Sequence, residues 1–235
     1  MPTERQLTVI EACAEIATLD IERRIDRIFI HHCFNPSASD YHGIQTVTGV
    51  GRTHARWWPK RSDHGYHVMI GPGGEVFFCC DWDKVGAHAK YHNARSIGVS
   101  YIADFGGGSG ERPPRDNPAT YAGLEAGQRV VAALCERLEL EPEDVWFHRQ
   151  VNSHKTCPGE LMDLDDYRAK VAAIMNGGIK LVLLTGSSDP DILIARSDQR
   201  VALEKLFVDD DQILVEVYDH IEDQNKVYFR KVNAE

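Results

Sequence analysis

The chain has 235 residues, of which 43% are hydrophobic and 26% are charged, the balance of a globular protein with a buried core. Its formal net charge of -10 argues against nucleic acid as a partner, because phosphate binding requires clustered Lys and Arg. No apolar run reaches the length of a membrane span, so we expect no membrane insertion. The N-terminus lacks a basic segment followed by an apolar one, so we expect synthesis in the cytoplasm without a signal peptide.

Hydrophobic periodicity and turn residues predict the elements of the first half. In chain order these are an amphipathic helix that begins near Thr3, a buried strand over 27–32, a short helix over 53–58, and two strands over 66–70 and 75–80. The segment Gly71 to Gly74 between the last two strands has turn chemistry, so we expect a hairpin.

A second group of elements precedes the expected domain boundary. The expected elements are a strand over 96–103, a loop over 105–114, a helix over 120–138, a short strand over 145–147 and a helix over 160–175. Asn176, Gly177 and Gly178 should end that helix. We therefore expect one domain over 1–178, with its core over about 27–175, and a small β-rich module over 179–235.

Three residues far apart in the chain have the chemistry of a zinc site. His31 ends a buried strand, His148 follows another, and Cys157 lies in a loop closed by Pro158 and Gly159. Imidazole nitrogen and thiolate sulfur bind zinc readily, and a catalytic site has three protein ligands and one open position. By spacing alone, however, a histidine after a strand is more often a hydrogen-bonded structural residue than a ligand.

Five short segments occur in a fixed order along the first domain. They are 28–33, which ends in His31, His32 and Cys33; 65–68; 86–89, followed by Asn93 and Ser96; 148–151; and 155–159. This ordered set resembles the motifs of the zinc amidases related to peptidoglycan recognition proteins and to the short amidase-type phage lysozymes. The resemblance covers residues 27 to about 160.

The resemblance implies an α/β fold in which a central mixed β-sheet is flanked by helices. It also implies a Zn²⁺ cofactor held by His31, His148 and Cys157. Neighbouring strand side chains point to opposite faces of a sheet, so His31 and His32 cannot both enter one site. The resemblance implies that His31 is the ligand, because in these amidases the ligand directly follows the apolar residues of the strand. The interval from His148 to Cys157 is one residue longer than in the family, so His154 is an alternative donor within that loop.

The implied reaction is hydrolysis of the amide bond between N-acetylmuramic acid and L-alanine of peptidoglycan. A zinc ion would lower the pKa of a water to about 7 and polarise the carbonyl group. We expect Lys155 to stabilise the oxyanion and Tyr66 to orient the water or assist proton transfer. His88 and Asn93 are expected to line the substrate groove, although they would equally fix the loop that contains them.

Two other functions remain open. One is a non-catalytic receptor that binds peptidoglycan, and the other is an amidase that also regulates a host protein by binding it. The presence of all three candidate ligands favours an enzyme. We expect a monomer whose partner is peptidoglycan, in the manner of a phage or prophage endolysin that acts on the cell wall after release. The role of 179–235 is open, with wall binding as one hypothesis.

Overall fold

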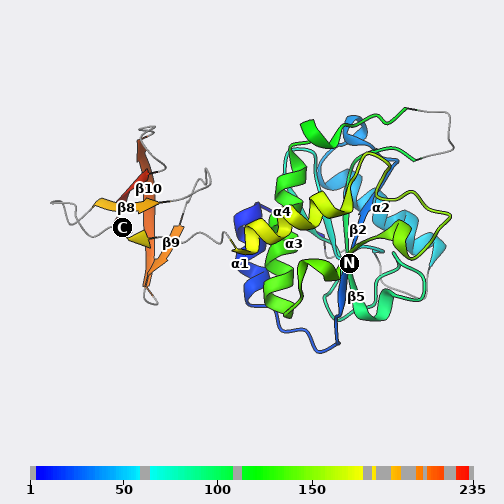
Figure 1. Cartoon of the computed structure of the whole chain (residues 1–235), viewed down its shortest axis with the longest axis horizontal. Coiled ribbons are helices and arrows are strands. Elements are labelled where there is room, and N and C mark those ends of the chain that lie inside the picture. The colour runs from blue at the N-terminus through cyan, green and yellow to red at the C-terminus, as the bar shows by residue number, and fades with distance from the viewer. Residues whose placement is uncertain are drawn as a thin grey trace. The chain divides into compact units, whose positions relative to one another are not determined.

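The computed structural model describes residues 4–58, 64–107 and 113–176, and the backbone of five strands between 182 and 232. The chain divides into two compact units, Met1–Met175 and Asn176–Glu235, each built on one β-sheet (Figure 1). The expected helix start at Thr3, the centre of the expected 105–114 loop and the glycine pair Gly177 and Gly178 lie outside the described residues.

The first unit contains a six-stranded mixed sheet. Its order is β1 (Arg5–Leu7), β4 (Val76–Phe78), β3 (Val68–Ile70), β5 (Ser96–Tyr101), β2 (Arg27–His32) and β6 (Val145–Phe147). Strands β3, β5, β2 and β6 are parallel neighbours, whereas β4 and β1 pair antiparallel at one edge. The expected hairpin is the β3–β4 pair, and the expectation of a mixed sheet flanked by helices is confirmed.

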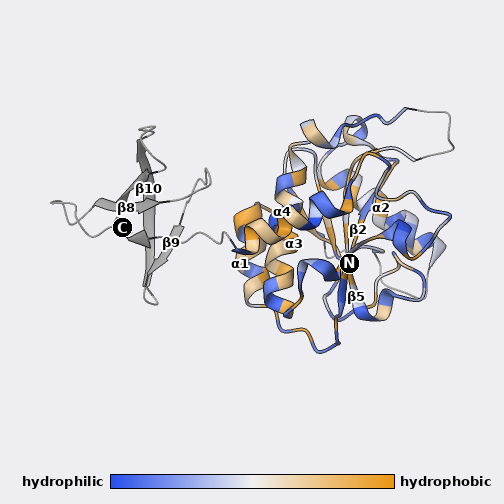
Figure 2. Ribbon diagram, in the orientation of Figure 1, coloured by the Kyte–Doolittle hydropathy of each residue, from blue (hydrophilic) through white to orange (hydrophobic). Residues whose placement is uncertain are grey.

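Four α-helices cover the two faces of this sheet. Helices α1 (Val9–Ala17), α3 (Gly123–Leu138) and α4 (Leu164–Asn176) lie on one face, and α2 (Ile44–Trp57) lies on the other (Figure 1). Strand alternation divides the core accordingly, since Val68 and Ile70 pack with the three helices whereas Met69 packs with Val47 of α2. Apolar residues are concentrated in the strands and in α1 (Figure 2).

The starts of all four helices differ from those expected, and α3 begins at Gly123 rather than at residue 120. Helix α1 begins after Thr8, whose hydroxyl accepts the Glu11 N–H while the Glu11 carboxylate accepts the Thr8 N–H. The preceding residues Arg5–Leu7 form the edge strand β1. Helix α2 begins at Ile44 rather than residue 53. Helix α4 begins at Leu164 rather than residue 160, because the Asp163 carboxylate accepts an N–H of its first turn.

The second unit contains a five-stranded sheet. Its order is β7 (Val182–Leu183), β8 (Ile192–Arg196), β11 (Lys226–Val232), β10 (Asp211–Asp219) and β9 (Lys205–Val208). Each of these neighbours pairs antiparallel. The expectation of a β-rich C-terminal part is therefore confirmed. Among the residues described, no helix is both long enough and apolar enough to cross a membrane.

Candidate metal centre

Two of the three candidate ligands lie at the carboxyl ends of adjacent parallel strands. The β2–β6 register pairs Ile30 with Phe147, so His31 and His148 follow directly on neighbouring strands. Their ring centroids are 4.7 Å apart. Polar side chains that follow the carboxyl ends of parallel strands commonly form the ligand sites of α/β sheets. The ladder thus brings two residues together that are 117 positions apart in the sequence.

The third candidate ligand joins them from a loop. Sγ of Cys157 lies 3.5 Å from Nδ1 of His31, and one ligand atom from each of the three residues lies within 4.8 Å of the other two. Bonds of about 2.0–2.3 Å to a tetrahedral ion place the donors about 3.3–3.8 Å apart, so the Cys157–His31 distance already fits and the widest donor separation must shorten by about 1 Å. Two imidazole nitrogens and one sulfur are donors that suit zinc. The residues therefore fit the implied ion.

Arg149, next to His148, organises the loop that contains Cys157. Its backbone N–H donates to the Cys157 carbonyl at 2.9 Å. Its guanidinium donates to the carbonyls of Gly159 at 2.6 Å and Met162 at 2.7 Å. Gly159 has a φ of 126°, and a Cβ at this position would lie 2.5 Å from the Phe105 carbonyl oxygen. The sequence alone did not predict this role of Arg149. The one feature that could have indicated it is the position of a charged residue directly beside a candidate ligand.

The protonation states of the cluster suit a cation. Burial, followed by the neighbouring His148, holds the pKa of His31 well below its usual value. Burial and then the charge of Lys155 lower the pKa of His148 to about 4. Both imidazoles are thus neutral at pH 7, which is their metal-binding form. Burial raises the pKa of the Cys157 thiol to about 12, so a bound cation must displace its proton.

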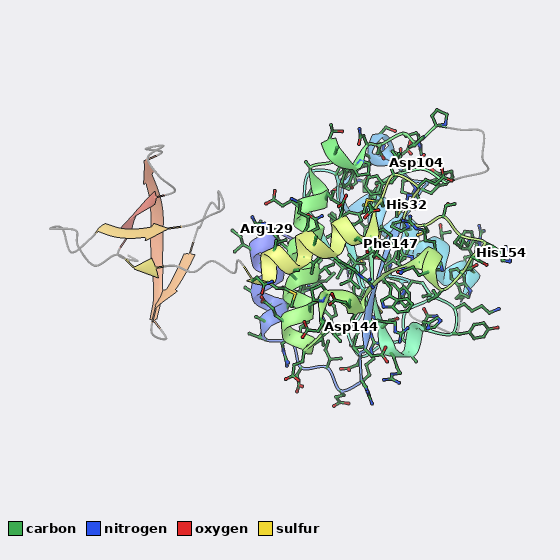
Figure 3. All side chains as sticks on the ribbon, viewed as in Figure 1. His32, Asp104, Arg129, Asp144, Phe147 and His154 are labelled. Carbon is green, nitrogen blue, oxygen red and sulfur yellow. The ribbon has the colours of Figure 1, made fainter. Side chains whose placement is uncertain are left out.

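His32 and His154, the other histidines near the cluster, are placed differently. Nδ1 of His32 accepts the Phe105 N–H at 3.1 Å, and the two rings stack. His32 thus turns toward the opposite face of the sheet from His31, as strand alternation requires. His154 is exposed at the rim of the unit, whereas His32 lies within it (Figure 3). Neither belongs to the group of converging donors found among the described residues.

A groove of about 930 Å³ opens beside the cluster. The lining includes His148, Cys157, Tyr66 and Lys155, together with several residues of α2. The rings of Tyr66 and His31 have centroids 5.1 Å apart. Burial, followed by the nearby cysteines, raises the pKa of Tyr66 well above its usual value, so the phenol keeps its proton. The two expected catalytic residues therefore share one cavity with two of the candidate ligands.

His88 and Asn93 lie behind the cluster. Nδ1 of His88 is 3.2 Å from Nε2 of His31, on the side of that ring away from Cys157. The Asn93 carboxamide oxygen accepts the backbone N–H groups of His88 at 3.0 Å and Ala89 at 2.7 Å. Neither residue is among those that line the groove. Their expected contact with substrate stays a prediction, and their contacts here are with His31 and its surrounding loop.

The fold and the cluster together define an α/β domain with a mixed sheet and a three-donor candidate metal centre at the ends of its parallel strands. This chain belongs to the family described as N-acetylmuramoyl-L-alanine amidase (Amidase_2), whose model matches residues 21–160. The matched segment includes all three candidate ligands. The family resemblance expected from the sequence motifs is thus confirmed.

The curated relatives include peptidoglycan recognition proteins of insects. Peptidoglycan-recognition protein 2 of Holotrichia diomphalia is 33% identical over 79 residues, which are 34% of this chain and 37% of the relative. A peptidoglycan-recognition protein of Drosophila melanogaster is 31% identical over 139 residues, which are 56% of this chain and 67% of the relative. The chain spans between 37% and 48% of the length of the first three relatives that it matches.

Among solved structures, the chain resembles the endolysin N-acetylmuramoyl-L-alanine amidase LysCS from Clostridium intestinale URNW. The TM-score is 0.50 at 20% sequence identity, over 64% of this chain and 85% of the other. LysC from the same organism gives the same TM-score and identity. At this identity the likeness concerns the fold alone, and it agrees with the mixed sheet of the first unit.

Proposed function

We propose that the protein is a zinc-dependent N-acetylmuramoyl-L-alanine amidase that releases stem peptides from peptidoglycan. The observation that supports this proposal most directly is the convergence of three donor atoms from His31, His148 and Cys157 within 4.8 Å of one another. These donors sit beside a groove of about 930 Å³, large enough for part of a glycopeptide. The family of the chain supports the same reaction.

In this mechanism His31, His148 and Cys157 hold the ion. A zinc ion supplies a Lewis acid that polarises the scissile carbonyl and lowers the pKa of the attacking water. Tyr66 remains a phenol at neutral pH and therefore acts as a hydrogen-bond donor rather than as a base. Its position on the groove wall beside His31 suits it to orient the water or the carbonyl.

Lys155 supplies the remaining charge. Its ammonium lies on an exposed part of the groove wall, two residues before Cys157. Its positive charge lowers the pKa of both His148 and Cys157, which supports a role for Lys155 beside the cluster. A cation at this position would stabilise the oxyanion that develops as the carbonyl is attacked. We therefore assign Lys155 to stabilisation of the transition state.

The test is digestion of purified peptidoglycan followed by mass spectrometry. Protein loaded with zinc is expected to release peptides with new L-alanine N-termini, and a chelator should stop that release until zinc is restored. Cys157→Ser protein provides a matched control, because it removes one donor but keeps the size of the side chain. New reducing sugar ends instead of peptide N-termini, or release that is unaffected by the chelator, would contradict the proposal.

A second candidate is a peptidoglycan receptor without hydrolytic activity. It is favoured by the curated relatives, whose names describe recognition rather than hydrolysis. Sedimentation with insoluble peptidoglycan separates the two functions. A receptor would bind equally well with and without zinc and leave the stem peptides attached, whereas an amidase would release them.

The biological setting that we propose is that of an endolysin, which acts on the wall after release from the cytoplasm. A protein with this role should lyse bacteria that express it only when their inner membrane is breached at the same time. Lysis by the intact chain in cells with an undamaged membrane would contradict this setting without affecting the proposed reaction.

A further inference from the structure

A chain of hydrogen bonds runs from the back of His31 into the domain. Nε2 of His31 lies 3.2 Å from Nδ1 of His88, and Nε2 of His88 lies 3.5 Å from the Ser96 hydroxyl. That hydroxyl lies 2.9 Å from the backbone carbonyl of His92. His31 is 1% exposed, His88 7% and Ser96 0%, so these groups must find their partners within the protein.

The backbone carbonyl of His92, at the end of this series of hydrogen bonds, fixes the donor and the acceptor in each of them. A carbonyl oxygen only accepts, so the single hydroxyl proton of Ser96 is committed to His92. The Ser96 oxygen must then accept from Nε2–H of His88, which leaves Nδ1 of His88 without a proton. Nδ1 of His88 must in turn accept from Nε2–H of His31.

We propose that His88 and Ser96 are positioning residues that hold His31 with its proton on Nε2 and the lone pair of Nδ1 facing the metal position. The reverse direction would put a proton on Nδ1 of His31, where it would point at Cys157 and prevent coordination. The inference rests on the proposed function in one respect, since it takes His31 to be a metal ligand. A hydrogen bond from the second ring nitrogen is a usual feature of metal-binding histidines.

The surroundings of His88 support this role. Asn93 fixes the backbone at His88 through two hydrogen bonds to its carboxamide oxygen. The His88 ring packs on Gly98 of β5, where a Cβ would lie 2.7 Å from two of its ring carbons. Any larger residue at position 98 would displace the ring from His31. Asn93 thus holds the backbone of His88, and the missing side chain of Gly98 leaves room for its ring.

The hydrogen-bond directions can be tested in the metal-free protein. Long-range proton–nitrogen NMR correlations identify which nitrogen of each imidazole carries the proton. We expect His31 and His88 both to be protonated on Nε2 alone, with the His31 proton protected from exchange with water. His88→Leu should abolish this protection, whereas His88→Asn should retain it, because Asn keeps an oxygen acceptor near the position of Nδ1. A proton on Nδ1 of either ring would overturn the proposal.

Zinc affinity provides the second readout. His88→Leu is expected to weaken zinc binding about 10–100-fold, the usual effect of removing such a partner, and His88→Asn to weaken it less. Ser96→Ala should also weaken it, and Ser96→Thr should restore it. Ser37→Ala is a matched control, because Ser37 is another fully buried serine whose hydroxyl bonds to Ser39 and Asp40 instead.

Competition with a chromophoric chelator measures these affinities with zinc alone as the probe. Equal losses in His88→Leu and His88→Asn would mean that the ring acts only by packing, and would overturn the proposal. Wild-type protein that fails to bind zinc at all would instead refute the proposed function. The NMR experiment would still decide the hydrogen-bond directions in that case, because it uses no metal.

Discussion

Acidification should destabilise the first unit through its buried histidines. His54, His64 and His67 are 9%, 1% and 0% exposed. Burial is the largest cause that lowers their pKa values, to about 4, 3 and 4 respectively. In the unfolded chain the same rings titrate near pH 6.5. As the pH falls below 6.5, the unfolded state therefore binds protons that the folded state refuses, and stability is lost until the folded pKa is reached.

The magnitude follows from the size of the pH interval. A group that is protonated only in the unfolded state changes the free energy of unfolding by up to about 1.4 kcal/mol per pH unit. Between pH 6 and pH 5 the unfolded rings go from mostly to almost fully protonated, which costs about 1 kcal/mol per histidine. The three rings together remove about 3 kcal/mol, a large part of the total stability of a typical domain.

Urea unfolding at pH 7.5, 6 and 5 in the presence of a chelator measures this loss. Tryptophan fluorescence reports on the first unit alone, because all four tryptophans lie there: Trp57, Trp58, Trp82 and Trp146. His64→Asn should make the pH dependence shallower by about 1 kcal/mol between pH 6 and 5. His42→Asn, which replaces an exposed ring, serves as the control. The same pH dependence in His64→Asn and wild-type protein would refute the reasoning.

Three substitutions test the candidate site itself. Cys157→Ser should abolish stoichiometric zinc binding, measured by metal analysis, while the circular dichroism spectrum stays that of the wild type. Lys155→Ala should lower kcat by about 100-fold or more with little change in KM, measured by steady-state hydrolysis of soluble muropeptides, because its contact forms mainly in the transition state. Arg149→Ala should weaken zinc binding, measured by chelator competition, because it removes the hydrogen bonds that hold the Cys157 loop.

The strand-borne part of the site was predictable from the sequence because it depends on local patterns. Apolar runs that end in His31 and His148 predict buried strands with polar residues at their ends. The pattern does not predict the register between β2 and β6, because no local feature of either segment indicates that Ile30 pairs with Phe147. The resemblance to known amidase motifs supplied the link between these segments and Cys157.

The helix boundaries show where local reasoning stops. In α2, Gly49 and Gly51 lie among β-branched residues, and both kinds of residue have low helix propensity. The sequence pattern therefore predicts only the part of the helix from residue 53 onward. Gly51 is required by packing, because a Cβ there would lie 2.7 Å from the His64 ring. The edge strand β1 depends on a partner about 70 residues away, and no signal within residues 5–7 identifies it.

The roles of His88 and Ser96 were hidden for a different reason. The motif over 86–96 predicts that His88 and Asn93 contact substrate or fix their loop, and it predicts no role for Ser96. Only the three-dimensional structure shows that Nδ1 of His88 faces His31 and that the Ser96 hydroxyl lies against a carbonyl. The direction of each hydrogen bond depends on all the groups that are linked in series. No single residue type in the sequence therefore reveals it.

The candidate ligands differ in how firmly the fold holds them, and this difference bears on whether the protein is an enzyme or a receptor. His31 belongs to a strand paired on both sides, and His148 directly follows a strand of the same sheet. Cys157 depends on a loop whose conformation rests largely on Arg149. Loss of the cysteine would leave the strand pairing of the sheet in place, because Cys157 takes no part in it. Under the proposed function, a single substitution at Cys157 would therefore remove hydrolysis and leave the sheet intact, whereas changes at His31 would also disturb the buried hydrogen bonds behind it.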